Sequence, residues 1–161
     1  MTVSETCPAI SVVIPVYNEG ANIRPLTSEI FDALNGRINY ELIYVDDGSV
    51  DDTPDEVERL LRQTSTIVLC RHNQNRGQSA AVRTGVESAR ADIVAVLDGD
   101  GQNDPHDILR LFGQLSMAPS LSMVIGERRN RKDNWLRRIS SRVANAIRAK
   151  LLGDGIKDTG C

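Results

Sequence analysis

The chain has 161 residues, 40% of them hydrophobic and 25% charged, and its formal net charge at pH 7 is −3. This length and apolar content suffice for one domain whose core needs no disulfide or metal, and the three cysteines form neither a C-x-x-C pair nor a zinc-ligand pattern with histidines. The scattered cysteines favour a reducing, cytoplasmic compartment. No run approaches the roughly 18 consecutive apolar residues of a membrane-spanning helix, and the N-terminus lacks a signal-peptide pattern, so we expect that this chain does not cross a membrane.

Hydrophobic periodicity predicts that strands and helices alternate along the chain. The continuous apolar, β-branched run Ile10–Val16 is typical of a strand that is buried on both faces of a parallel sheet. Thr53, Pro54 and Glu56 predict a capping box at a helix start. The predicted strands are 10–16, 40–45, 66–70, 93–97 and 122–125, and the predicted helices are 23–34, 53–63, 77–89 and 105–115.

This alternation predicts an α/β fold with a mostly parallel central sheet and helices on both faces. Ligands of such sheets bind beyond the carboxyl ends of the strands. Three predicted strand ends carry acidic side chains, in Asn18-Glu19, Asp46-Asp47 and Asp98-Gly99-Asp100, so we expect a site there. No G-x-G-x-x-G or G-x-x-x-x-G-K-[ST] motif occurs, which removes the main support for dinucleotide-binding and P-loop sites.

Two carboxylates, Asp98 and Asp100, follow the fourth predicted strand. Their hard oxygen ligands favour Mg²⁺, Mn²⁺ or Ca²⁺ over zinc, and Mg²⁺ normally completes its shell with substrate phosphates. A calcium loop of the helix-loop-helix type is excluded, because it needs glycine and glutamate where this chain has Asn103 and Leu109. Capping and turn formation before a helix at Pro105 is the structural alternative.

Four motifs stand in order after the first four predicted strands: P-V-Y-N-E (15–19), V-D-D-G-S (45–49), N-x-x-x-G (73–77) and L-D-G-D-G-Q (97–102). Together they resemble glycosyltransferase family 2 over residues 10–161, and within it the dolichyl- or polyprenyl-phosphate sugar transferases, whose metal motif reads D-x-D-x-Q. The resemblance implies a nucleotide-diphospho-sugar transferase (GT-A) fold. It also implies metal-dependent, inverting transfer of a mannose- or glucose-type sugar from a GDP- or UDP-linked donor to polyprenyl or dolichyl phosphate.

The resemblance further implies roles for individual residues. The nucleotide-sugar would contact Pro15, Tyr17, Glu19, Asp47, Asp98 and Arg128, with Asp47 accepting a hydrogen bond from the base and Arg128, in G-E-R, lying near a phosphate. Mg²⁺ or Mn²⁺ would bind Asp98, Asp100 and Gln102, and the implied catalytic residues are Asp100 and Asp158.

Asp158 lies in D-T-G-C, which resembles the family's acceptor-side segment. With a sugar hydroxyl as acceptor, Asp158 would be the base. A lipid phosphate is already largely dianionic at pH 7, so Asp158 would then orient the acceptor. An ordinary polar residue near a chain end is the alternative.

Charge is distributed unevenly, because residues 1–127 carry 9 Lys and Arg against 19 Asp and Glu, whereas residues 128–161 carry 10 against 3. The basic segment 128–152 has an apolar stripe at helical spacing, with Trp135 near its start. Such a segment can lie on an anionic membrane surface, which predicts a protein peripheral to the cytoplasmic face, without nucleic acid as a partner. Packing of the stripe on its own domain is the alternative.

We expect residues 1–161 to form a single glycosyltransferase domain, the N-terminal part of a longer enzyme that is truncated here and can continue into C-terminal membrane helices. A transferase acting on a sugar hydroxyl and a nucleotide-binding module inactive in this form are alternatives. A phospho-acceptor signalling domain would need a lysine at a strand end, and a nucleotidyltransferase would need a glycine-rich loop after the first strand; neither occurs. His72 and His106 are expected to be surface or capping residues.

Overall fold

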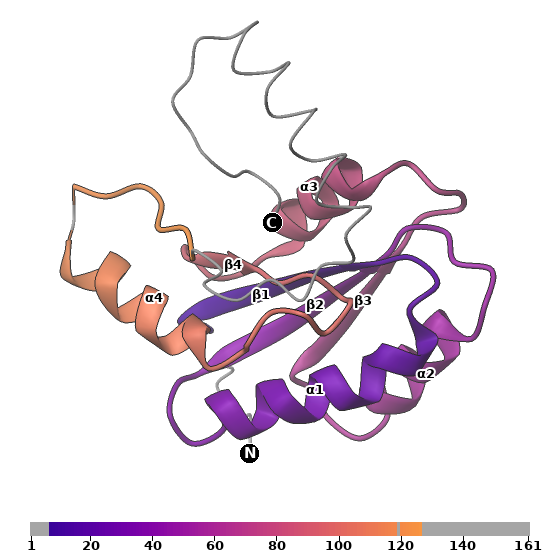
Figure 1. The fold of residues 1–161 in the computed structure, drawn as a ribbon, viewed down its shortest axis with the longest axis horizontal. Helices are drawn as coiled ribbons and strands as arrows, with labels where there is room; N and C mark the ends of the chain where they lie inside the picture. Colours follow the sequence, from indigo (N-terminus) through magenta and orange to yellow (C-terminus); the bar gives the residue numbers. More distant parts are fainter. Residues whose placement is uncertain (1–6, 119, 127–161) are drawn as a thin grey trace, which may run out of the picture. The chain divides into compact units, whose positions relative to one another are not determined.

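Four parallel strands form the central sheet, in the order β3-β2-β1-β4 (Figure 1). They are seen in a computed structural model that describes residues 7–118 and 120–126. Strand β1 runs parallel to β2 along its whole length, so that the ends of both strands are aligned. The strands are β1 Ile10–Val16, β2 Tyr40–Asp46, β3 Ile67–Arg71 and β4 Val94–Val96.

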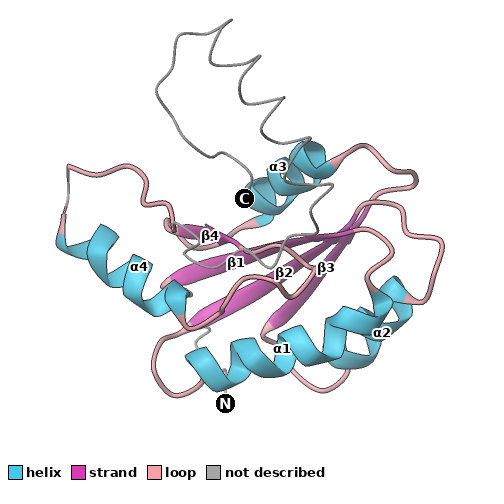
Figure 2. Ribbon diagram, viewed as in Figure 1, coloured by secondary structure: helices cyan, strands magenta, loops and turns pink. Residues whose placement is uncertain are grey.

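Each strand is followed by a helix, which confirms the predicted α/β fold. Helices α1 and α2 cover one face of the sheet and α3 covers the other (Figure 2). All of these elements belong to one compact unit that ends at Val124. None of the helices in the described part of the chain is long and apolar enough to span a membrane. The helices are α1 Gly20–Leu34, α2 Thr53–Leu61, α3 Gln78–Ser88 and α4 Asp107–Met117.

The two faces of the sheet carry separate cores. Every residue of β1 and β2 is buried, because helices cover both of their faces. The larger core lies between the sheet and helices α1, α2 and α4, and Ile108 of α4 belongs to it. The smaller core, under α3, contains Val13, Ile43, Val45 and Ala81. A side chain at Gly85 of α3 would collide with Val13, so this helix lies very close to the sheet.

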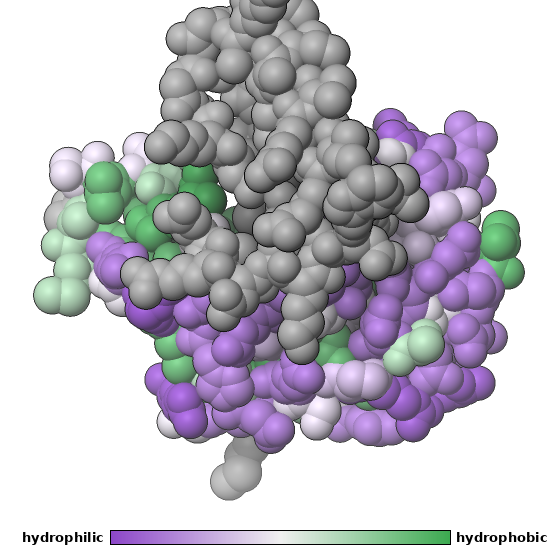
Figure 3. Space-filling model, in the orientation of Figure 1, coloured by the Kyte–Doolittle hydropathy of each residue, from purple (hydrophilic) through white to green (hydrophobic). Residues whose placement is uncertain are grey.

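The predicted strand at 122–125 does not form in the described part of the chain. The run of four residues pairs with no described strand, and Met123 is 70% exposed. Figure 3 shows hydrophobic side chains gathered over α4 and the segment that follows it, where Met117 and Leu121 are also exposed. A short apolar run without a neighbouring strand therefore remains irregular.

The predicted capping box of α2 is also wrong. Helix α2 begins at Thr53 itself, and the Thr53 hydroxyl donates to Asp51 rather than accepting from the helix. The Glu56 carboxylate bonds Arg24 of α1 at 2.5 Å, so it does not reach back to the cap. Tertiary ion pairing has replaced the local capping pattern.

Glu41 of β2 is buried at the other end of the strand from Asp46, and it holds the segment that leads into β4. Its carboxylate accepts hydrogen bonds from Ser11 (2.6 Å) and from the backbone and side chain of Arg90 (2.8 and 2.7 Å). Burial alone would raise the pKa of Glu41, but these hydrogen bonds and the Arg90 charge hold the pKa below its usual value. Glu41 is therefore charged at neutral pH and stabilises the fold in that form.

We expect Glu41→Gln to lower the free energy of unfolding at pH 7 by about 2 kcal/mol, because Arg90 loses its charged partner. A lowered folded-state pKa stabilises the protein above the unfolded-state pKa of about 4.3, and this stabilisation is lost as the pH falls through the folded-state value. The free energies of unfolding of wild type and variant, measured by urea denaturation, should therefore approach each other below about pH 4. Glu87→Gln, in the exposed pair with Arg83, is the control and should cost under about 0.5 kcal/mol. A difference that persists at low pH would contradict the role of the charge.

Candidate active site

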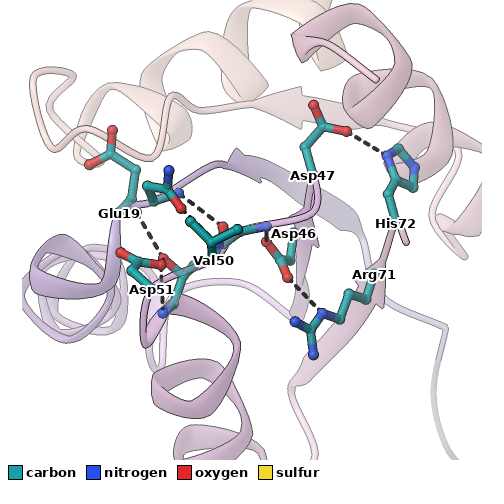
Figure 4. Close-up of polar contacts among 10 residues, drawn as sticks. Glu19, Asp46, Asp47, Val50, Asp51, Arg71 and His72 are labelled. Carbon is teal, nitrogen blue, oxygen red and sulfur yellow. Dashed lines mark hydrogen bonds and ion pairs between the residues drawn. The ribbon is translucent and has the colours of Figure 1, made fainter. Parts of the chain in front are cut away.

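The turns that follow β1 and β2 bind each other directly. Asn18 has a left-handed backbone (φ 55°), and its side-chain oxygen accepts the Val50 N–H at 2.9 Å. The Asn18 N–H donates to the Ser49 hydroxyl at 2.9 Å, and the Glu19 N–H donates to the Thr53 hydroxyl at 2.8 Å. The P-V-Y-N-E and V-D-D-G-S motifs therefore form one hydrogen-bonded unit, part of which is drawn in Figure 4.

Consecutive carboxylates at the end of β2 point in different directions (Figure 4). Asp46 lies 3.0 Å from the Arg71 guanidinium, and its other oxygen accepts the Ser49 N–H at 2.9 Å. Asp47 points toward His72, as expected from the alternation of side chains along a strand. The two adjacent acids therefore organise different parts of the site.

Asp47 is only 3% exposed and is surrounded by donors from the segment after β3. Oδ1 of Asp47 lies 2.6 Å from His72 Nδ1 and accepts the Arg76 N–H (2.9 Å), and Oδ2 accepts the Gly77 N–H (2.7 Å). Burial alone would raise the pKa of Asp47, but these hydrogen bonds and the His72 ring hold the pKa below its usual value. Asp47 is therefore a buried carboxylate that stays ionised.

Gly48 allows the turn after β2 to lie against the same segment. Its φ is +75°, and a Cβ at this position would come within 2.5 Å of the backbone of Gln74 and 2.7 Å of that of Asn75. Any side chain would separate the turn from the segment that binds Asp47. Close backbone contact therefore requires glycine here.

The L-D-G-D-G-Q motif lies against the end of β1. Gly99 is buried, and a Cβ there would lie 2.6 Å from Val16 Cγ1 and 3.0 Å from the Pro15 carbonyl oxygen. The two oxygens of Asp98 accept hydrogen bonds from Gln78 (2.9 Å) and Asn103 (3.3 Å). The fold thus brings the first and fourth motifs together, although about 80 residues separate them in the chain.

Asp98, Asp100 and Gln102 offer a donor set that suits a hard divalent cation. Asp98 and Asp100 are partly buried, Gln102 is exposed, and one oxygen of Asp100 accepts the Gln102 N–H at 3.0 Å. No group of three or more His, Cys, Asp or Glu side chains within the described ranges could hold a metal alone. Two carboxylates and one amide are oxygen donors of the kind that Mg²⁺ or Mn²⁺ takes, with its remaining ligands normally supplied by phosphates or water.

The remaining predicted residues are distributed as follows. Pro15 is buried in β1, whereas Tyr17 beside it is 45% exposed. The Glu19 carboxylate accepts a hydrogen bond from Asn22 at 2.5 Å. Arg128 and Asp158 lie outside the described residues, as does the basic segment 128–152.

His72 is the site residue that sequence reasoning missed. It was expected at the surface or at a cap, but its side chain is only 6% exposed and lies between Asp47 and Thr84. The parallel register pairs Asp46 with Arg71, which puts the next residues, Asp47 and His72, side by side. Only the register of β2 against β3, which periodicity does not give, could have shown this.

We expect Gly48→Ala to lower the free energy of unfolding by about 3 kcal/mol, because left-handed strain adds to a collision with backbone atoms. Gly36→Ala is the matched control, since Gly36 has φ +70° but open space around its Cβ position. The control should cost about 1 kcal/mol, from backbone strain alone. Denaturant unfolding measures both variants, and equal losses would show that the contact with 74–75 contributes nothing.

Comparison with known proteins places these motifs in a family. The family model for glycosyl transferase family 2 matches residues 11–159. The dodecaprenyl-phosphate galacturonate synthase of Rhizobium johnstonii is 36% identical over 94% of this chain and 46% of its own length. The undecaprenyl-phosphate 4-deoxy-4-formamido-L-arabinose transferase of Aeromonas hydrophila is 39% identical over 94% of this chain and 47% of its own length. The chain thus spans about half the length of these curated relatives.

Solved structures agree with the predicted GT-A fold. The mannosyltransferase PcManGT from Pyrobaculum calidifontis, in complex with GDP-Man and Mn²⁺, has a TM-score of 0.57 and 28% identity over 65% of this chain and 31% of its own. TarS residues 1–349 from S. aureus have a TM-score of 0.60 and 18% identity over 77% of this chain and 40% of their own, which supports the fold alone. Together with the family match over 11–159, these similarities show that the chain belongs to glycosyl transferase family 2.

Proposed function

We propose that this chain is the donor-binding part of a glycosyltransferase that moves a sugar from a nucleotide-diphospho-sugar to a polyprenyl phosphate. The observation that carries the proposal is the position of the Asp98–Gln102 motif, which lies against the end of β1 beside the P-V-Y-N-E turn. The names of the two curated relatives support the polyprenyl phosphate acceptor. The GDP-Man and Mn²⁺ bound to the P. calidifontis enzyme support the donor class and a divalent metal.

The donor would lie along the carboxyl edge of the sheet. Tyr17, the residue after β1, is 45% exposed, which suits contact of its ring with a base or ribose. Asp47 is already bonded within the protein, with two partners on Oδ1 and one on Oδ2, so Oδ2 can accept a further hydrogen bond from a base. Pro15 and Glu19 complete the proposed nucleoside side.

Asp98, Asp100 and Gln102 would hold Mg²⁺ or Mn²⁺ at the diphosphate. When bound, the metal would stabilise the negative charge that develops on the leaving diphosphate. The protein's part is to fix two carboxylates at a strand end, where repulsion between them favours a cation. Arg128 is proposed to add a further positive charge near a phosphate.

The proposed reaction is a single displacement with inversion. A phosphate oxygen of the acceptor forms a bond to the anomeric carbon as the bond from that carbon to the diphosphate breaks. An acceptor phosphate at pH 7 needs no base, so Asp158 is proposed to orient the acceptor. The GDP or UDP base and the mannose- or glucose-type sugar stay predictions from the motifs, since the relatives' names include galacturonate, a formamido-arabinose and mannose.

We also propose that residues 1–161 form one catalytic domain of a longer enzyme that works at the cytoplasmic face of a membrane. The basic segment 128–152 would bind an anionic membrane surface, where a polyprenyl phosphate acceptor resides. The chain spans about half the length of these curated relatives, which supports a longer enzyme.

The test is calorimetric binding of UDP and of GDP, each with and without Mn²⁺. We expect one nucleotide to bind in a metal-dependent way, and Asp100→Asn to weaken that binding at least about tenfold through loss of a metal ligand. Asp92→Asn is the control, since Asp92 is exposed in the turn that leads into β4, at the opposite edge of the sheet. No binding of either nucleotide by the folded wild type, or equal losses in the two variants, would contradict the proposal.

A further inference from the structure

One short segment, His72–Gln78, contacts both of the carboxylates that the proposed donor site depends on. Asp47 lies at the end of β2 and Asp98 follows β4, and the strand order places β1 between these two strands. No hydrogen bond joins the two carboxylates directly among the described contacts. The segment between β3 and α3 nevertheless bonds to each of them.

The first end of the segment is fixed to β2. Asp47 receives His72 Nδ1 and two backbone N–H groups, so both of its oxygens are held. The His72 N–H also donates to the Asp46 carbonyl oxygen at 2.9 Å. Asp46 and Asp47 thus make four contacts with residues 72–77. A buried carboxylate that lost its donors would be strongly unfavourable, so these contacts restrain the backbone of 72–77.

His72 also ties this end to α3. Its second ring nitrogen, Nε2, lies 2.9 Å from the Thr84 hydroxyl, two turns into the helix. The ring is buried, and Figure 4 shows it directed at Asp47 from the end of β3. One side chain thus links α3 to the end of β2.

The second end of the segment reaches the metal motif. Gly77, whose N–H is bound by Asp47, is followed directly by Gln78, the first residue of α3. The Gln78 amide donates to Asp98 Oδ1 at 2.9 Å. A neutral donor orients a carboxylate without cancelling its charge, which leaves the carboxylate able to bind a cation.

We propose that His72–Gln78 couples the ends of β2 and β4, and that His72 and Gln78 are positioning residues that hold Asp47 and Asp98 in place for the donor and its metal. This inference rests on the proposed function, because it assigns a purpose to contacts around the proposed donor site. Neither residue is proposed to take part in the chemistry. Each acts through the carboxylate that it contacts.

The first test measures Mn²⁺-dependent binding of UDP or GDP by calorimetry in wild type, Gln78→Met, Asp98→Asn and the double variant. Gln78→Met keeps the length of the side chain but removes the donor, so we expect roughly five- to tenfold weaker binding. In the Asp98→Asn background the same change should cost less than about twofold, because Gln78 acts through Asp98. Gln114→Met, at an exposed position of α4, is the control and should bind as wild type does.

The outcomes separate this inference from the proposed function. If wild type binds neither nucleotide, the proposed function fails and the inference fails with it. If wild type binds and Asp98→Asn weakens binding, but Gln78→Met binds as wild type does, only the inference is overturned. Equal effects of Gln78→Met in both backgrounds would also overturn it, since Gln78 would then act independently of Asp98.

The second test addresses His72 at the other end of the segment. His72→Asn keeps a donor near Asp47 but loses the contact with Thr84, whereas His72→Leu loses both contacts. We expect His72→Leu to weaken nucleotide binding more than His72→Asn, and its effect to be less than additive with Gln78→Met. Thermal unfolding identifies a variant that does not fold, in which case His72→Asn carries the test. Wild-type affinity in both His72 variants, or full additivity, would contradict the coupling.

Discussion

The hydrogen bonds that surround the buried, ionised carboxylate of Asp47 are the interaction on which the rest of the site depends. A buried charge must be matched by donors, and here they come from the segment that follows β3. That segment must therefore fold back over the end of β2 rather than extend into solvent. Its position then determines where α3 begins, and the first residue of α3, Gln78, donates a hydrogen bond to Asp98 of the L-D-G-D-G-Q motif. A local electrostatic requirement at one strand end thus shapes the edge of the sheet.

Glycines make this arrangement possible at two points of close contact. Gly48 lets the turn after β2 touch the backbone of 74–75, and Gly99 lets the L-D-G-D-G-Q motif touch the end of β1. Both contacts join segments that are distant in sequence, and in both the absence of a side chain brings the backbones together. The acidic residues are the ones proposed to bind the donor and its metal, and the adjacent glycines determine how closely the segments that carry them can approach each other.

The sequence predicted the layers of the fold well, because βαβ periodicity depends on burial and β1 and β2 are buried throughout. It also predicted that the acids would meet at one edge, since parallel strands end together. It did not predict the capping of α2, where Glu56 pairs with Arg24 in space rather than with its own helix. Nor did it predict the role of His72, which depends on the register of two strands. Local patterns identify elements, whereas contacts between elements require the register and the tertiary packing.

The close approach of α3 to the sheet has a consequence for protein engineering. Glycine inside a helix normally invites replacement by alanine, which gains about 1 kcal/mol of helix propensity. At Gly85 the added methyl group would collide with Val13 and lift the helix that carries both Thr84 and Gln78. Gly85→Ala, chosen to improve thermostability, would thus push α3 away from the sheet. The displacement would shift Gln78 at the start of the helix, and the expected effect is weaker binding at the proposed nucleotide site. The interior of α3 is consequently a poor place for consensus-style stabilisation, even though it lies away from every proposed ligand contact.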